Sequence, residues 1–357
     1  MVSAASPSLI FSIGSPLLDI TVPVDLSFIS SIGMEPDRAT VIPAEELQRQ
    51  LDLLPKDSVF KYTPGGSALN TARNLQVLLN ENNIEGVVTY TGSVGTDKRS
   101  DILRNSVERT GLNAILVPTT DAPTGATGVY TNGNSRSMAA SLGAAAKLKE
   151  SALDSDEARA ALESSKICYA CGFALSDYFP VAYKLAKYAA DNNKPFVFNF
   201  SSPFMCTAFH ENMAKLVAYA DIICCNLDEL STFVKVHGLD TSDPFRAVAE
   251  LPFAEDKKHT ARTLIITNGK YDTTFYQEGR QYVFPVNTLP DNQVVDGNGA
   301  GDAFVAGFLF TLLTQDHETL KFDYETLEKS INFAHDIAAR CIAHVGSSII
   351  DDVRIEM

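Results

Sequence analysis

The stretch Val294-Val295-Asp296-Gly297-Asn298-Gly299-Ala300-Gly301-Asp302-Ala303-Phe304 changes character twice. It begins with β-branched residues, passes through three glycines and continues into an apolar segment, which predicts a strand end, a tight turn and a helix start. Glycine lets the backbone approach a ligand, and the first N–H groups of a helix lack partners within it. Because the helix dipole adds positive potential there, the stretch predicts an anion-binding turn at Gly299, Ala300 and Gly301.

Asp302 stands in the first turn of that expected helix, beside the anion site. A carboxylate in this position can accept the proton of a hydroxyl that attacks phosphorus. It can equally do no more than stabilise the helix N-terminus, because acidic residues are favoured in first turns. The residue alone leaves both interpretations open.

The run from Asp296 to Phe304 resembles the C-terminal signature of the ribokinase-like (PfkB-type) kinases. In that family the Gly-Ala-Gly backbone forms an anion hole and the final Asp is the catalytic base. The resemblance therefore implies these roles for residues 299–301 and for Asp302, and it places Gly297 and Asn298 on the nucleotide side. Gly297 departs from the pattern, because members that phosphorylate adenosine usually carry Thr there.

A second glycine turn, Tyr62-Thr63-Pro64-Gly65-Gly66-Ser67-Ala68-Leu69-Asn70, precedes an expected helix for which Ser67 is a favourable N-cap. By itself the pattern predicts only a turn. It resembles the N-terminal signature of the same family, Gly-Gly-Ser-x-x-Asn, which holds the ribose of the acceptor. The resemblance implies that Gly65, Gly66, Ser67 and Asn70 bind the substrate.

Ser15-Pro16-Leu17-Leu18-Asp19 follows a short apolar run that predicts a buried strand. It resembles an Asn-Pro-Leu-Leu-Asp element whose Asp grips the ribose hydroxyls in the nucleoside kinases of the family. A carboxylate can accept hydrogen bonds from two vicinal hydroxyls. Ser15 replaces the family's Asn, and together with Ala39 and Ala174 it leaves the preferred base open. The resemblance adds Phe204 to the acceptor-binding residues.

Asn226-Leu227-Asp228-Glu229 resembles the Asn-x-x-Glu motif, which implies that Asn226 and Glu229 organise Mg²⁺ and phosphate, largely through water. The acidic residues also suit a helix N-terminus. Further resemblances place residues at the nucleotide or on a lid: Thr267 and Gly269 in a nucleotide-side turn, His335 toward adenine, and Arg136 toward the phosphates. A packed histidine and a solvated arginine are the alternatives for the last two.

From Lys166 onward, apolar strand-like runs alternate with helical segments. Repeated βα units of this kind predict a parallel sheet covered on both faces. We expect one ribokinase-like α/β domain over residues 1–357, with a central mostly parallel sheet flanked by helices. β-type segments within about 17–44 and 112–142, including Ala114 to Val117, predict a small β-rich lid.

Composition limits the binding partners and the cellular location that we expect. The formal charge of −15 disfavours nucleic acid and anionic membranes as partners. The chain shows no leader-like segment near Met1 to Ser8 and no apolar run of about 20 residues, so we expect a cytoplasmic protein, with the nucleus also compatible. Cys168-x-x-Cys171 and Cys224-Cys225 lie in apolar runs without a second metal-ligand pair, which favours buried thiols.

The resemblance implies ATP-dependent phosphorylation of the 5′-hydroxyl of adenosine to AMP, with Mg²⁺ accompanying ATP and room for a monovalent cation. We expect a monomer, because a lid completes the site within one chain. Three alternatives stay open: a kinase for inosine, guanosine or cytidine, a ribokinase-type sugar kinase, and a nucleoside-binding protein without catalysis. A P-loop kinase is excluded, because Gly-x-x-x-x-Gly-Lys-[Ser/Thr] does not occur.

Overall fold

The computed structural model describes residues 6–133, 135–258, 261–314, 320 and 322–350. Residues 1–5, part of the segment on which the absence of a leader was predicted, lie outside these ranges. None of the helices within them combines the length and apolar character that crossing a bilayer needs.

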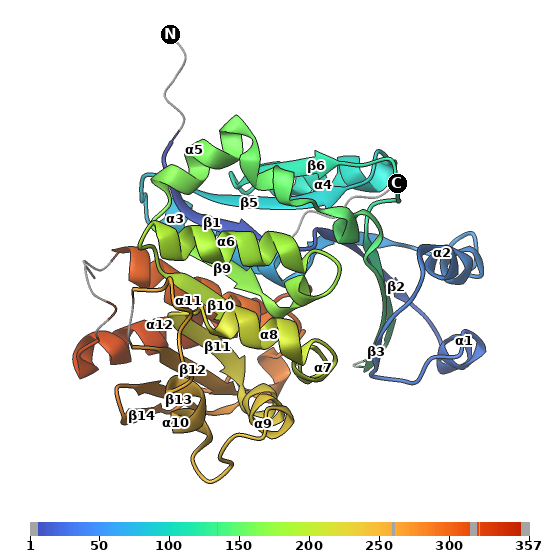
Figure 1. Ribbon diagram of the computed structural model, residues 1–357. Coiled ribbons are helices and arrows are strands. Elements are labelled where there is room, and N and C mark those ends of the chain that lie inside the picture. Colours follow the sequence, from blue (N-terminus) through green and yellow to red (C-terminus); the bar gives the residue numbers. More distant parts are fainter. Residues whose placement is uncertain (1–5, 134, 259–260, 315–319, 321, 351–357) are drawn as a thin grey trace.

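A nine-stranded sheet forms the body, in the order β14-β13-β12-β11-β10-β9-β1-β5-β6 (Figure 1). Every neighbouring pair is parallel except the edge hairpin of β13 and β14 and its contact with β12. The prediction of a mostly parallel sheet is thus confirmed. The strands are β1 (Ser8–Ile13), β5 (Val87–Val94), β6 (Asn113–Pro118), β9 (Ile167–Cys171), β10 (Phe196–Asn199), β11 (Ile222–Asn226), β12 (Thr263–Asn268), β13 (Tyr271–Gln277) and β14 (Arg280–Phe284).

Helices cover both faces of this sheet, because its central strands are apolar on both sides. Tyr169 and Cys171 of β9 pack into one core, and Cys168 and Ala170 between them pack into the other. The first core holds α3 (Ser67–Glu81), α4 (Lys98–Glu108), α11 (Ala300–Thr314) and α12 (Tyr324–Ile342). The second holds α5 (Asp156–Ser164), α6 (Phe179–Asp191), α7 (Pro203–Ala208), α8 (His210–Val217), α9 (Leu227–Val236) and α10 (Pro244–Ala249).

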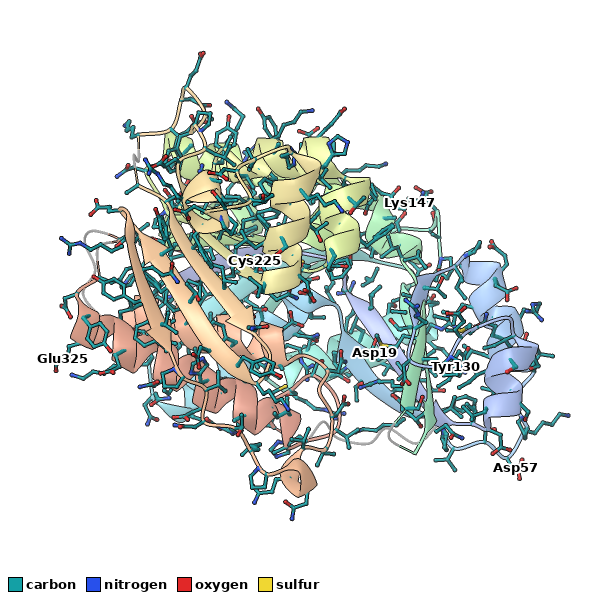
Figure 2. All side chains as sticks on the ribbon, turned by 90° about the horizontal axis from the view of Figure 1, so that it is seen from below. Asp19, Asp57, Tyr130, Lys147, Cys225 and Glu325 are labelled. Carbon is teal, nitrogen blue, oxygen red and sulfur yellow. The ribbon has the colours of Figure 1, made fainter. Side chains whose placement is uncertain are left out.

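A second, five-stranded sheet projects from the body, in the order β3-β8-β7-β2-β4. Its strands are β2 (Leu17–Pro23), β3 (Ala39–Val41), β4 (Lys61–Gly65), β7 (Ala126–Asn132) and β8 (Ser135–Ser141). Two helices, α1 (Leu26–Ser31) and α2 (Ala44–Asp52), pack on it through Ile29 and Leu47 beside Tyr130. Figure 2 shows Tyr130 toward these helices and Asp19 toward the body. We call this unit the lid sheet.

One strand assignment was wrong, and one strand of the lid sheet was not predicted. Residues 114–117 were expected in the lid, but they form part of β6 at the edge of the main sheet. The physical reason is the helical crossover α4, which returns the chain so that β6 pairs in parallel with β5. The lid sheet instead gains β4, which pairs antiparallel with β2 and brings Thr63 opposite Asp19.

Candidate active site

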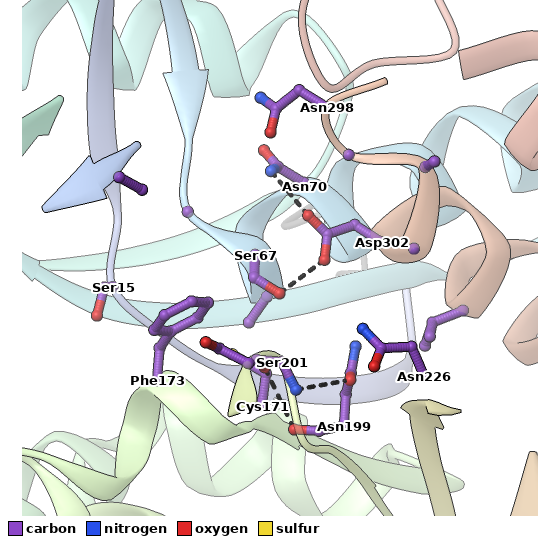
Figure 3. Close-up of a pocket in the computed structure, with 18 of the residues that line it drawn as sticks. Ser15, Ser67, Asn70, Cys171, Phe173, Asn199, Ser201, Asn226, Asn298 and Asp302 are labelled. Atoms are coloured by element: carbon purple, nitrogen blue, oxygen red, sulfur yellow. Dashed lines mark hydrogen bonds between the residues drawn. The ribbon is translucent and has the colours of Figure 1, made fainter. Parts of the chain in front are cut away.

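The two glycine turns meet at one carboxylate (Figure 3). The hydroxyl of Ser67 donates to Oδ1 of Asp302 at 2.6 Å, and the Asn70 side-chain amide donates to Oδ2 at 3.0 Å. Ser67 and Asn70 lie in the first turn of α3, and Asp302 lies in the first turn of α11. The structure therefore joins two sequence signatures that are more than 200 residues apart.

The start of α3 differs from the prediction that Ser67 caps the helix. Gly66 is the N-cap residue, with a φ of +100°, and Ser67 is the first helical residue. A Cβ atom on Gly66 would lie 2.0 Å from the carbonyl oxygen of Ser15, so a side chain has no room there. Because the Ser67 hydroxyl is not used as a cap, it is available to Asp302.

A cleft of about 550 Å³ lies between the lid sheet and the body and contains Asp302 in its wall. Its walls come from the carboxyl ends of the parallel strands, the N-termini of α3 and α11, and the lid sheet, as expected for an α/β fold. Most of the predicted site residues share this cleft: Ser15, Asp19, Gly66, Ser67, Asn70, Phe204, Asn226, Glu229, Thr267, Gly297, Asn298, Gly299, Ala300, Gly301 and Asp302.

The order of the strands sets the order of side chains along the cleft. Thr267, Asn226, Asn199, Cys171 and Ser15 follow or end β12, β11, β10, β9 and β1, which are neighbours in the sheet. Asn226 and Ser15 are therefore three strand spacings apart, roughly 14 Å. Figure 3 shows them toward opposite sides of the pocket. The cleft therefore extends across the ends of five neighbouring strands.

One end of the cleft combines a lid carboxylate with apolar side chains. A Cβ atom on Gly65 would lie 2.4 Å from Oδ1 of Asp19, so the glycine leaves the space that this carboxylate occupies. Ser15, buried at 6% exposure, shares a 2.9 Å hydrogen bond with the hydroxyl of Tyr178. Phe173 and Phe204, which also line the cleft, are exposed at 39% and 62% and can contact an apolar ring.

Asp302 is partly buried at the centre of the cleft. Burial raises the pKa of this carboxyl to about 6, and the hydrogen bonds from Ser67 and Asn70 oppose the rise. At neutral pH the group is mostly ionised but more basic than an exposed Asp. These are the properties that a general base for a hydroxyl requires.

At the other end, Asn226 and Glu229 form a reciprocal capping box at the start of α9. Glu229 is 4% exposed, and burial raises its pKa to about 7. A buried carboxylate of this kind would be held in its ionised form by a nearby cation. The described part of the chain contains no cluster of three or more His, Cys, Asp or Glu side chains arranged to hold a metal, so Glu229 fits a metal bound mainly by phosphate and water.

Three predicted nucleotide-side residues do not line the cleft. His335 is buried, its Nε2 is 2.8 Å from Oγ1 of Thr273, and its ring packs 5.5 Å from that of Phe304. These contacts are those of a packed histidine. Gly269 occupies the turn between β12 and β13 with a φ of +59°.

Arg136 also lies off the cleft wall, on strand β8 of the lid sheet. Its Nη1 contacts Oδ1 of Asp296 at 2.5 Å. Asp296 in turn accepts hydrogen bonds from the backbone N–H groups of Asn298 and Gly346. The ion pair therefore ties the lid sheet to the loop that precedes the anion turn.

Sequence reasoning missed several residues of the cleft, among them Cys171, Phe173, Asn199 and Ser201. Ser201 has a φ of +71°, and its N–H bonds Oδ1 of Asn199. Their only signal is position, since all of them follow or end a parallel strand. Tyr178, which lies behind Ser15, carries no such signal.

A glycine-rich helix N-terminus that carries a partly buried carboxylate, at the mouth of a mostly parallel α/β sheet, fits a phosphotransferase with an alcohol group as acceptor. The family model described as pfkB family carbohydrate kinase matches residues 38–353. The chain belongs to this family, as the signatures predicted.

Several known proteins similar to the chain are named adenosine kinase. Adenosine kinase 2 of Arabidopsis thaliana is 33% identical over 310 residues, which cover 86% of this chain and 88% of the relative. The adenosine kinase of Saccharomyces cerevisiae is 31% identical, with 94% and 95% covered. The solved structure of the Schistosoma mansoni adenosine kinase in complex with 2-fluoroadenosine has 27% identity and a TM-score of 0.85, covering 98% of this chain and 99% of that one.

Proposed function

We propose that the protein transfers the γ-phosphoryl group of ATP to the 5′-hydroxyl of adenosine, giving AMP and ADP. The observation that carries the proposal is the position of Asp302, which Ser67 and Asn70 of the acceptor turn hold beside the anion turn. A hydroxyl bound at the first turn is thereby placed beside both a base and a phosphate site. The resemblance to several adenosine kinases supports adenosine as the acceptor.

In this mechanism the acceptor's ribose lies between Asp19 and Asn70. The Asp19 carboxylate accepts hydrogen bonds from the vicinal hydroxyls, and Gly66 lets the sugar approach the backbone. The 5′-hydroxyl gives its proton to Asp302 as its oxygen attacks the γ-phosphorus and the bond to the leaving ADP breaks. Holding both partners in this geometry lowers the entropic part of the barrier.

Charge on the transferring group is stabilised by the start of α11. Ala300 is its first residue, and the N–H groups near Gly299 and Gly301 belong to the turn that opens the helix. Gly299 has a φ of +75°, and a Cβ atom there would lie 2.5 Å from that of Ser347. Donors fixed in this way stabilise the transition state without reorganising.

Glu229 and Asn226 would hold Mg²⁺ at the phosphates through water, and the bound ion would neutralise phosphate charge. Arg136 would act from the lid. Its pairing with Asp296 sets the lid sheet against the loop before the anion turn, which favours closure over the bound acceptor and exclusion of water.

The test is ADP release from MgATP by the purified protein, measured separately with adenosine, inosine, guanosine, cytidine and ribose. We expect the highest kcat/KM with adenosine. Faster turnover of ribose would favour a sugar kinase, and another preferred nucleoside would change the substrate but not the mechanism. Adenosine binding by calorimetry without ADP release would overturn the proposal of catalysis.

A further inference from the structure

The acceptor end of the cleft contains a pair of buried hydroxyl groups that the mechanism does not use. Ser15 Oγ and Tyr178 Oη are 2.9 Å apart, and either can be the donor. Ser15 lines the cleft, whereas Tyr178, at 0% exposure, lies behind it as the residue before α6. The Ser15 hydroxyl can therefore face a ligand on one side while Tyr178 holds it on the other.

The ligand group at Ser15 is the base, because the reacting hydroxyl must lie at Asp302. Ser15 follows β1, and the phosphate residue Asn226 ends β11, three strands away. Asp19, two residues into the lid strand β2, takes the sugar between them. The part of a nucleoside that extends beyond its sugar then reaches Ser15 and Phe173, which Figure 3 draws together at one side of the pocket.

Adenine presents a hydrogen-bond acceptor at ring position 1 and a hydrogen-bond donor at position 6. Hypoxanthine and guanine present the reverse, a donor at position 1 and an acceptor at position 6. A side chain of fixed polarity distinguishes the two patterns strongly, because the wrong one leaves buried groups unpaired. A serine hydroxyl has one donor and two acceptor sites. When Ser15 donates to the base it accepts from Tyr178, and when it accepts from the base it donates to Tyr178.

Tyr178 has a neutral hydroxyl in both states, because burial raises its pKa far above neutrality. A further hydroxyl lies close by: Tyr90 Oη is 3.0 Å from the position of a Cβ atom on Gly14, the residue before Ser15. Within the described part of the chain Tyr90 Oη has no hydrogen-bond partner. A water between the two would let Tyr90 accept a hydrogen bond from the Tyr178 hydroxyl when Ser15 donates to Tyr178.

We propose that Ser15 and Tyr178 form a reversible hydroxyl pair that lets the site accept 6-oxopurine ribonucleosides, such as inosine, as well as adenosine. The proposal rests on the proposed kinase function and names its substrate class. A fixed hydrogen-bonding site would reject inosine by roughly 10⁴-fold or more. We expect kcat/KM for inosine to lie within about 100-fold of that for adenosine, and a larger gap overturns the proposal.

Tyr178→Phe tests the pair itself. Without the tyrosine oxygen, Ser15 can still donate to a base but has no partner for its own hydrogen when it accepts from one. The nucleoside that donates an N–H to Ser15 should therefore lose kcat/KM relative to the other. The ratio of kcat/KM for inosine to that for adenosine should change by about tenfold or more. Tyr188→Phe, in α6 itself but outside the cleft, should leave the ratio unchanged.

Ser15→Ala supplies a second measurement, because its small change of volume keeps the fold. The alanine variant should lower kcat/KM for both nucleosides by about tenfold or more and raise KM more than it lowers kcat. An unchanged inosine-to-adenosine ratio in Tyr178→Phe, with folding verified by circular dichroism, overturns the pair. Absence of ADP release with every nucleoside would instead refute the kinase function.

Discussion

Replacing Asp302 by Asn distinguishes between the two roles open to this residue, a catalytic base and an acid that only stabilises the helix. The amide is nearly isosteric, and its oxygen can still accept from Asn70 while its NH₂ group donates to the Ser67 hydroxyl. The fold should therefore persist. The amide cannot accept the proton of the 5′-hydroxyl, so kcat should fall by about 100-fold or more.

The same substitution should stabilise the protein at alkaline pH. The pKa of Asp302 rises from its ordinary 3.8 to about 6, and each unit corresponds to about 1.4 kcal/mol. Ionisation then costs the folded state up to about 3 kcal/mol at pH 8 and about half of that at pH 5. Both values are upper limits, because the Asp302 side chain is partly exposed to water, which lowers the cost of its ionisation. Since the folded-state pKa is the higher one, the wild type loses this stability as pH rises from about 4 through 6.

Urea unfolding at pH 8 and pH 5 measures the difference between Asp302→Asn and the wild type, and ADP release measures kcat. Asp101→Asn is the matched control, because Asp101 is an exposed acid in the first turn of α4. It should leave kcat unchanged and destabilise slightly. Turnover of Asp302→Asn within tenfold of wild type, or equal effects on stability at both pH values, would refute the reasoning.

Three further changes test other parts of the cleft. Glu229→Gln should raise the Mg²⁺ concentration needed for half-maximal ADP release roughly tenfold and change the KM of adenosine less than threefold, and an unaltered Mg²⁺ titration would contradict this role. Gly66→Ala, which places a Cβ atom 2.0 Å from the Ser15 carbonyl oxygen, should lower the free energy of unfolding in urea by about 2 kcal/mol or more. Its control, Gly238→Ala, has a similar positive φ but open space, and should cost only about 1 kcal/mol. His335→Ala should lower that free energy by about 1–3 kcal/mol through the loss of the Thr273 bond, while the KM of ATP stays within threefold. A tenfold rise in that KM would favour the adenine contact.

The mostly parallel sheet was predicted from the sequence, because its strands are continuous apolar runs that alternate with helical segments, whereas the strand order was not. The lid was predicted less well. Whether residues 114–117 pair with β5 or with the lid depends on the crossover α4, and nothing in so short a run decides this. Both glycine turns were identified from their patterns, since close backbone approach demands glycine at positions such as Gly66.

Contacts between distant residues lay beyond the sequence. That Ser67 bonds Asp302 rather than capping its own helix depends on how α3 and α11 pack. The environment of His335 likewise follows from β13 and α11, which supply Thr273 and Phe304. Tyr178 belongs to no signature, and only the folded chain places it behind Ser15. Tertiary packing thus decides hydrogen-bond partners that a motif leaves open.

Two of the cleft carboxylates, Glu229 and Asp302, are coupled through their charges. Burial is the main reason that the pKa of Glu229 rises to about 7, and the charges of Asp228 and then of Asp302 add to the rise. In a chain of net charge −15 this repulsion would oppose ATP as well. Positive potential at the start of α11 offsets part of it, and a cation beside Glu229 would remove more. We therefore expect MgATP binding near pH 7 to release protons from Glu229. Calorimetry in buffers of different ionisation enthalpy would detect them, and a buffer-independent binding enthalpy would contradict this coupling.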